Sequence, residues 1–261
     1  MTFRTVLALA VATTVPFAAY ATERHAAAHG AHHAPHWSYE GETGPAAWGK
    51  LEKDFSTCSI GKVQSPIDIT TAKAGKANLG PIAFAYKTST LKIIDNGHTI
   101  QVNVDGGSSI SIGGQTYELK QFHFHRPSEE KIDGKSYEMV AHMVHKSAEG
   151  KLAVVGVLFT QGTESAFLQK IWDNLPTETG KEITVAGATF NPIDLLPAKR
   201  SYYNFSGSLT TPPCSEGVNW FVLNTPVEVS RAQYARFGAM YPMNARPTQQ
   251  VNGRPIQLAG E

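Results

Sequence analysis

The stretch QFHFH at 121–125 contains two histidines that are separated by a single residue, and each follows a phenylalanine. Successive side chains of a β-strand point to opposite faces, so His123 and His125 share one face while Phe122 and Phe124 share the other. The pattern predicts a strand that buries its phenylalanines in a core and presents two imidazoles together. Such a pair is a good candidate for binding a metal.

A third metal ligand must come from another strand. The stretch EMVAHMVHK at 138–146 offers His142 and His145. These two differ by three positions and therefore face opposite ways, so only one of them can join the pair. Three neutral imidazoles without a thiolate suit zinc with an open fourth position, which is typical of a catalytic site.

The same residues also fit the metal motif of the cupins, which are jelly-roll proteins. His123, His125 and Glu129 have the cupin spacing of two histidines and a glutamate. A cupin carries a Pro-x-Gly motif shortly before a further histidine, and SYEMVAHMVH at 136–145 contains neither proline nor glycine. The cupin alternative is therefore weak.

The N-terminus has the pattern of a secretory signal peptide. Arg4 gives a positive start, the run from Val6 to Ala19 is largely apolar, and Ala19-Tyr20-Ala21 is a small-x-small cleavage site. We expect residues 1–21 to be removed near Ala21 and the protein to be periplasmic or secreted. The alternative, a membrane anchor, needs an apolar run of about 20 residues, and this run is shorter.

Export determines how the two cysteines are interpreted. An even count in an oxidising compartment favours a disulfide between Cys58 and Cys214, with two free buried thiols as the alternative. The formal net charge is +1 and no block of like charges occurs, so nothing indicates a nucleic-acid partner. We expect no membrane span in the mature protein.

The segment that follows the predicted signal peptide is rich in histidine. Residues 22–36 read TERHAAAHGAHHAPH, in which alanine, glycine and proline give little to bury, so we expect a flexible linker. Transient capture of divalent metal by its histidines is the alternative. We divide the chain into a signal peptide at 1–21, a flexible His-rich segment at 22–47 and one domain at 48–261.

From Trp48 onward the sequence has residue patterns typical of a β-rich fold. Alternating β-branched residues between Asn-Gly and Gly-Gly turns predict strands, and a run that is apolar on both faces predicts a central strand. The predicted strands lie within 91–104, 107–125, 138–146 and 152–159, the last being central. Helical spacing occurs at 165–175 and 231–240.

With these residues assembled, the chain resembles the α-class carbonic anhydrases, and closely the exported bacterial ones. The resemblance runs from about Trp48 to Ile256 and rests on segments that occur in the family's order. They are Trp48-Gly49, QSPIDI at 64–69, NGH at 96–98, QFHFH at 121–125, HMVH at 142–145, LAVVGVLF at 152–159, GSLTTPPCSEGVNW at 207–220 and NARPTQQVNGRPI at 244–256. The family's fold is mainly β (α+β), a single domain around a twisted, mostly antiparallel sheet of about ten strands with short peripheral helices.

The resemblance implies that zinc is bound by His123, His125 and His142, and that His145 is a buried structural histidine. The implied reaction is reversible hydration of carbon dioxide to bicarbonate and a proton by zinc-bound hydroxide. Zinc is known in this family to lower the pKa of bound water to about 7. Sensitivity to sulfonamides is also implied, and a homodimer is expected because bacterial members are often dimers.

Further residues acquire roles from the resemblance. Thr210 orients the zinc-bound hydroxide and donates to Glu129, Gln121 supports His123, and the Cys58–Cys214 bond braces the loop that carries Thr210. The pocket for carbon dioxide comprises Val144, Val154, Leu209, Thr211, Val218 and Trp220.

His98 matches the family's proton shuttle. Direct proton release from a group of pKa about 7 is limited to about 10³ s⁻¹, because recombination proceeds at about 10¹⁰ M⁻¹s⁻¹. Carbonic anhydrases are known to reach about 10⁶ s⁻¹, so a relay is needed. Histidine has an intrinsic pKa of about 6.5, which suits that task.

Val140 departs from the family pattern, which places a glutamate two residues before the third zinc histidine. Valine cannot accept the imidazole proton, and Glu138 lies too far along an extended strand to substitute. We therefore expect water or backbone to complete the surroundings of His142 and zinc retention to be weakened, so that Val140→Glu should tighten zinc. Gln101 and Lys50 also replace an asparagine and a tyrosine of the family.

A non-catalytic relative that binds or buffers zinc is the competing function. Catalytically silent relatives lose a zinc histidine, whereas this chain keeps all three together with Thr210 and Glu129. This retention favours the enzyme.

Overall fold

The computed structural model describes Met1 and residues 37–259. Residues 2–36, which contain the predicted signal peptide and the histidines of 22–36, lie outside the described residues, as do 260–261. Within the described part of the chain, no helix is long and apolar enough to cross a membrane.

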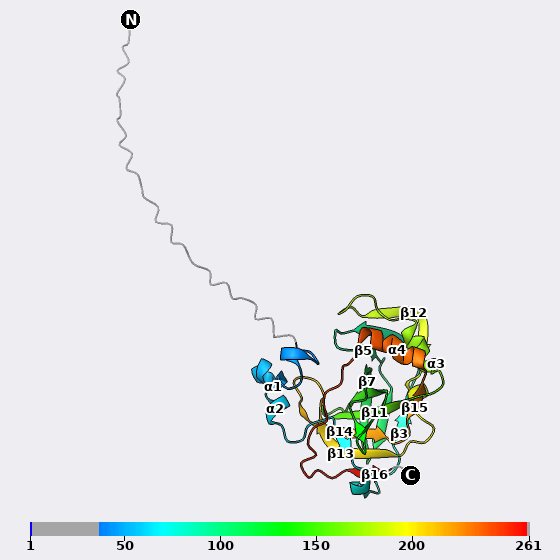
Figure 1. Ribbon diagram of the computed structural model, residues 1–261. Coiled ribbons are helices and arrows are strands. Elements are labelled where there is room, and N and C mark those ends of the chain that lie inside the picture. Colours follow the sequence, from blue (N-terminus) through cyan, green and yellow to red (C-terminus); the bar gives the residue numbers. More distant parts are fainter. Residues whose placement is uncertain (2–36, 260–261) are drawn as a thin grey trace. The chain divides into compact units, whose positions relative to one another are not determined.

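A large sheet dominates the described chain (Figure 1). Ten of its strands are paired in the order β12-β4-β5-β7-β10-β11-β14-β13-β16-β2, with β3, β6 and β15 added at its sides. The strand bounds are β2 Gly75–Lys76, β3 Ala83–Ala85, β4 Ser89–Asp95, β5 Ile100–Asn103, β6 Ser109–Ile112, β7 Gln115–His125, β10 Met139–Lys146, β11 Leu152–Gln161, β12 Ile183–Phe190, β13 Tyr202–Ser208, β14 Glu216–Leu223, β15 Val227–Val229 and β16 Gln257–Ala259.

The pairing is antiparallel except where β11 meets β14 and β15, and where β16 meets β2. The apolar strand β11 lies between β10 and β14, which confirms its predicted central place. The expectation of a mainly β fold around a mostly antiparallel sheet is likewise confirmed. A separate small sheet contains β1 Asp68–Ile69, β8 Lys131–Ile132 and β9 Lys135–Ser136.

The helices are short, as expected. They are α1 Trp48–Leu51, α2 Thr57–Ile60, α3 Ala166–Trp172 and α4 Arg231–Met240, with 3-10 turns at Gly41–Thr43, Lys53–Phe55, Thr71–Lys73 and Pro192–Leu195. Helix α4 begins after Ser230, whose side chain accepts from the backbone of Gln233 while the Gln233 side chain accepts from Ser230. This reciprocal cap satisfies two backbone donors that the helix itself cannot.

The two faces of the sheet carry different apolar clusters. Phe122 and Phe124 are fully buried in the larger one, together with Trp172 of α3 and Phe237 of α4. The smaller cluster contains Val140 with residues of β11, β13 and β14. The burial of the two phenylalanines anchors β7 by about 1.5–3 kcal/mol each and leaves its histidines on the opposite face.

Candidate metal centre

The three predicted ligands meet on β7 and β10. His142 lies directly opposite His123 in the pairing of these strands, and His125 follows two residues along β7. One nitrogen of each ring lies within 4.8 Å of the others. His145 lies apart from this group, with its Nε2 at 2.8 Å from the Tyr86 hydroxyl. The structure thus settles which histidine of β10 joins the pair.

The first two ligands have their remaining nitrogen next to an oxygen acceptor. Nδ1 of His123 lies 2.8 Å from Oε1 of Gln121, as the resemblance implied. Nδ1 of His125 lies 2.7 Å from the backbone oxygen of Asn244. When Nδ1 donates its proton in this way, Nε2 carries the lone pair that a metal requires. The Nε2 atom of His125 is buried and makes no hydrogen bond to any described residue.

The third ligand is held by a residue that the sequence interpretation missed. Nε2 of His142 lies 3.1 Å from each carboxylate oxygen of Glu130, and both side chains are buried. The expectation that water or backbone completes the surroundings of His142 is therefore wrong. Strand parity identifies only acceptors on the strand of His142 itself, whereas Glu130 comes from the loop between β7 and β8.

The site favours neutral imidazoles at its first two positions. Burial, with a contribution from His142, lowers the pKa of His123 to about 3, and burial also lowers the pKa of His125. Burial acts to lower the pKa of His142 as well, but Glu130 and then Glu129 outweigh it and raise that pKa. Three convergent imidazoles with no thiolate, each with its second nitrogen beside an oxygen acceptor, fit zinc.

Glu129 lies beside the ligands. Its Oε2 is 3.5 Å from Nε2 of His125 and 3.7 Å from Nδ1 of His142. Its Oε1 accepts from the backbone nitrogen of Arg246 at 2.7 Å. Burial raises the pKa of Glu129 to about 7, although His142 and a hydrogen bond from Thr210 act to lower it. The structure therefore brings Thr210 and Glu129 together at the metal centre.

The predicted pocket residues gather beside the centre. One apolar cluster contains five of them, Val144, Val154, Leu209, Val218 and Trp220. Val144 lies opposite Val154 on the next strand, and Val154 lies opposite Trp220 on the one after. The Trp220 ring centroid is 4.9 Å from that of His142, so this wall adjoins the ligands. Thr211, the sixth pocket residue, is half-buried in the turn that follows Thr210.

His98 lies in the turn between β4 and β5. The side-chain oxygen of Asn96 accepts from the backbone nitrogens of His98 and Thr99, each at 3.0 Å. Gly97 has a φ of +85°, a conformation that glycine adopts without strain. The imidazole of His98 stacks on the indole of Trp37, with 3.5 Å between the ring centroids.

Asn244 links the His98 turn to the metal centre. Its side-chain nitrogen donates to the backbone oxygen of His98 at 3.0 Å and to that of Phe124 at 3.0 Å. Its backbone oxygen accepts from His125. One residue from the C-terminal part of the chain therefore positions both the turn and a metal ligand.

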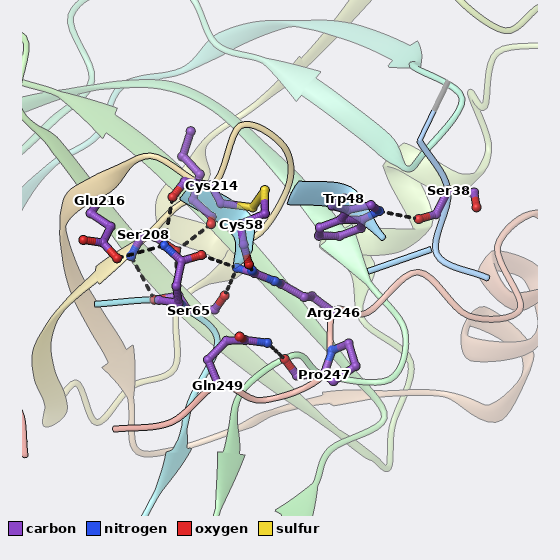
Figure 2. The surroundings of a disulfide bond; sticks show 12 residues. Ser38, Trp48, Cys58, Ser65, Ser208, Cys214, Glu216, Arg246, Pro247 and Gln249 are labelled. Carbon is purple, nitrogen blue, oxygen red and sulfur yellow. Dashed lines mark hydrogen bonds between the residues drawn. A yellow bond between two sulfur atoms is a disulfide. The ribbon is translucent and has the colours of Figure 1, made fainter. Parts of the chain in front are cut away.

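The predicted disulfide is present and adjoins a buried arginine (Figure 2). Cys58 and Cys214 are 156 positions apart in the sequence, with their Cα atoms at 5.0 Å. Nη2 of Arg246 donates to the backbone oxygen of Cys58 at 3.1 Å, and Nε2 of Gln64 donates to that of Cys214 at 3.1 Å. Because the Arg246 backbone also binds Glu129, the disulfide is connected to the metal centre.

Aromatic residues at the start of the predicted domain and just before it also contribute to the site. Trp37, Tyr39 and Trp48 pack edge to face. Burial, and then the nearby Glu129, raises the pKa of Tyr39 well above its ordinary value. Lys50, for which the resemblance implies a tyrosine in the family, is exposed. The signal that could have identified Tyr39 is the pair of aromatics in WSY at 37–39.

Comparisons with known proteins agree with this site. Residues 43–260 match the model of the eukaryotic-type carbonic anhydrases. The carbonic anhydrase of Pectobacterium carotovorum is 43% identical over 254 residues, which cover 96% of this chain and 98% of the relative. That of Neisseria gonorrhoeae is 44% identical over 233 residues, or 88% and 90% of the two chains.

A solved structure is also similar. The α-carbonic anhydrase from Thermovibrio ammonificans, in complex with the inhibitor sulfanilamide, has a TM-score of 0.83 and 45% identity, covering 85% of this chain and 98% of that one. The chain belongs to the α-class, eukaryotic-type carbonic anhydrase family. It is accordingly a lyase that interconverts carbon dioxide and bicarbonate at a metal site formed by His123, His125 and His142.

Proposed function

We propose that the chain hydrates carbon dioxide at zinc held by His123, His125 and His142, with named roles for Thr210, Glu129 and His98. The observation that carries this proposal is the convergence of the three rings, each with its second nitrogen beside an oxygen acceptor. Zinc, when bound, supplies a nucleophile at neutral pH by lowering the pKa of water to about 7, a value known for this class of enzyme.

Thr210 and Glu129 orient the attacking oxygen. A threonine hydroxyl has one proton, so if Thr210 donates that proton to Glu129 it can only accept from the attacking oxygen. This leaves a lone pair of that oxygen directed at the substrate. The backbone nitrogen of Arg246 holds Glu129 in place by donating to its Oε1.

The apolar wall binds the substrate and excludes water. Carbon dioxide is apolar, so it gains from contact with Val144, Val154 and Trp220 rather than with water. Val218 extends the wall, and Leu209 and Thr211 lie on the segment that leads to and from Thr210.

His98 accepts the proton that each hydration produces and passes it to buffer. It lines a cleft of about 240 Å³ together with Trp37, Tyr39 and Tyr241. It is only half-buried, so water and buffer can reach it. Its intrinsic pKa of about 6.5 allows it to take up and release a proton near neutrality.

Export and assembly also belong to the proposal. Because disulfides form and persist in oxidising compartments, the Cys58–Cys214 bond supports export. We infer that the protein is periplasmic or secreted after cleavage near Ala21. N-terminal sequencing of the protein recovered from the periplasm or medium tests the cleavage. A homodimer, expected from the bacterial family members, is tested by the mass of the purified protein in solution.

Stopped-flow hydration of carbon dioxide by the zinc-loaded protein tests the proposal directly. We expect fast hydration that a sulfonamide abolishes. The matched control is His123→Ala, which removes one ligand and should bind less zinc and lose activity. A full complement of zinc on the parent without hydration would overturn the proposal in favour of a zinc-binding or zinc-buffering relative.

A further inference from the structure

On β10, the position two residues before His142, which lies on the same face, is apolar. Val140 shares the strand and the face of His142, is fully buried, and packs in the smaller apolar cluster. It lies opposite His125 on β7 and opposite Leu158 on β11. No side chain on this part of β10 can accept a proton from His142.

The acceptor comes instead from a loop that is fixed in several places. The Ser128 hydroxyl donates to the backbone oxygen of Glu130 at 2.7 Å and accepts from the backbone nitrogen of Tyr137 at 2.9 Å. The backbone nitrogen of Lys131 donates to Ile67 at 3.2 Å. These bonds hold the backbone on both sides of Glu130, so its carboxylate is held beside His142.

The two nitrogens of His142 face different carboxylates. Nδ1 lies on the side of Glu129, towards which Nε2 of His125 also points. Nε2 lies between the two oxygens of Glu130 at 3.1 Å from each. A carboxylate in that place accepts the Nε2 proton and leaves the Nδ1 lone pair directed at the other ligands.

We propose that Glu130, from the loop between β7 and β8, is the positioning residue of the third metal ligand, a role that no side chain of β10 fills in this chain. The inference rests on the proposed function in one respect, that zinc occupies the three histidines. It also changes the expected effect of Val140→Glu. That variant would place a second carboxylate beside Glu130 in a buried region, where two like charges repel, so it should not tighten zinc while Glu130 is present.

Competition with a chromophoric zinc chelator tests the proposal through zinc affinity and zinc release rather than activity. Glu130→Gln keeps the shape of the side chain and removes its charge, so we expect zinc affinity to fall about 10–100-fold. Glu138→Gln makes the same chemical change on a nearby residue that does not hold His142, and should retain the parent affinity. Glu130→Ala with Val140→Glu returns a carboxylate to the strand and should regain most of what Glu130→Ala alone loses.

Nitrogen NMR of the zinc-loaded protein labelled in its histidines adds a signature that a purely structural role would not give. In the parent, His142 should bind zinc through Nδ1 and keep a slowly exchanging proton on Nε2. That proton should exchange faster in Glu130→Gln and be slow again in the double variant.

The outcomes separate the inference from the proposed function. A parent that binds no zinc at the three histidines overturns both. A parent that binds zinc, with Glu130→Gln of equal affinity and equal Nε2 exchange, overturns only the role of Glu130. If Glu130→Ala does not fold, the zinc affinity and Nε2 proton exchange of the isosteric Glu130→Gln decide whether Glu130 positions His142.

Discussion

The indole of Trp37 lies flat on the imidazole of His98, with ring centroids 3.5 Å apart and ring planes inclined by 7°. Trp37 in turn packs edge to face on Trp48, which is fully buried. The stack therefore connects the proposed shuttle to an anchored aromatic group and defines one position of its ring. Aromatic stacking contributes about 0.5–1.5 kcal/mol beyond area burial, enough to bias the orientation of a side chain.

Removing the shuttle should make turnover depend on added buffer. We expect His98→Ala to lower turnover in weak buffer towards the limit of about 10³ s⁻¹ for unassisted proton release. Imidazole added to the solution should restore turnover, because it can carry the proton in place of the side chain. Stopped-flow measurements across buffer concentrations provide the check. Equal rates of parent and variant in weak buffer would remove His98 from the mechanism.

Removing the stacking partner should affect the same step more mildly. We expect Trp37→Ala to lower turnover in weak buffer but to leave kcat/KM unchanged, because the metal ligands and the apolar wall are untouched. Trp37→Phe keeps an aromatic face, so its turnover in weak buffer should lie between that of the parent and that of Trp37→Ala. A fall in kcat/KM with unchanged buffer dependence would show instead that Trp37 supports the metal centre.

The Thr210 hydroxyl should matter for turnover and not for zinc. Thr210→Val keeps the shape but removes the hydroxyl, and a misdirected nucleophile can cost about 10²-fold in rate. Thr210→Ser restores a hydroxyl and should recover much of the loss. Zinc content, measured by metal analysis, should equal that of the parent in both. Parental turnover in Thr210→Val would contradict the orienting role.

The disulfide should stabilise the domain strongly because it closes a long loop. We expect Cys58→Ser with Cys214→Ser to lower the free energy of unfolding by about 2–5 kcal/mol. Denaturant unfolding of the zinc-free forms measures the difference. A reducing agent should lower the parent to the level of the double variant and leave that variant unchanged. Coincident unfolding curves of oxidised parent and double variant would refute this expectation.

The alternation of phenylalanine and histidine on β7 could be interpreted from sequence because it depends only on strand geometry. Phe122 and Phe124 are fully buried in the larger core, and the two histidines emerge on the other face. Strand parity alone leaves both His142 and His145 as possible third ligands, because it does not determine which face of β10 lies on the side of the β7 histidines. The register that places His142 opposite His123 resolves the choice.

Glu130 could not be identified in this way. Its contact with His142 depends on how the loop after β7 returns over the sheet, and no periodicity describes such a path. Asn244 and Arg246 pose the same difficulty, because each reaches the site from more than a hundred residues away. Strand periodicity thus predicts the ligands, while tertiary contacts determine what holds them.

His145 should make stability depend on pH. It is fully buried, its Nε2 lies 2.8 Å from the Tyr86 hydroxyl, and burial lowers its pKa to about 3. Between pH of about 6.5, where histidine titrates in the unfolded chain, and about 3, the unfolded state binds a proton that the native state does not. The free energy of unfolding must therefore fall as the pH decreases through this range.

His145→Gln removes the titrating group and can still accept or donate a hydrogen bond at Tyr86. We expect it to be less stable than the parent by about 1–3 kcal/mol at pH 8, with the difference shrinking as the pH falls towards 4. Denaturant unfolding of the metal-free protein in chelator gives the two curves without a contribution from zinc release. Tyr86→Phe keeps the imidazole, so its free energy of unfolding should change with pH in the same way as that of the parent. If the free energy of unfolding of His145→Gln also changes with pH as that of the parent does, His145 does not titrate on unfolding in this range. The acid sensitivity of the fold must then come from other buried groups.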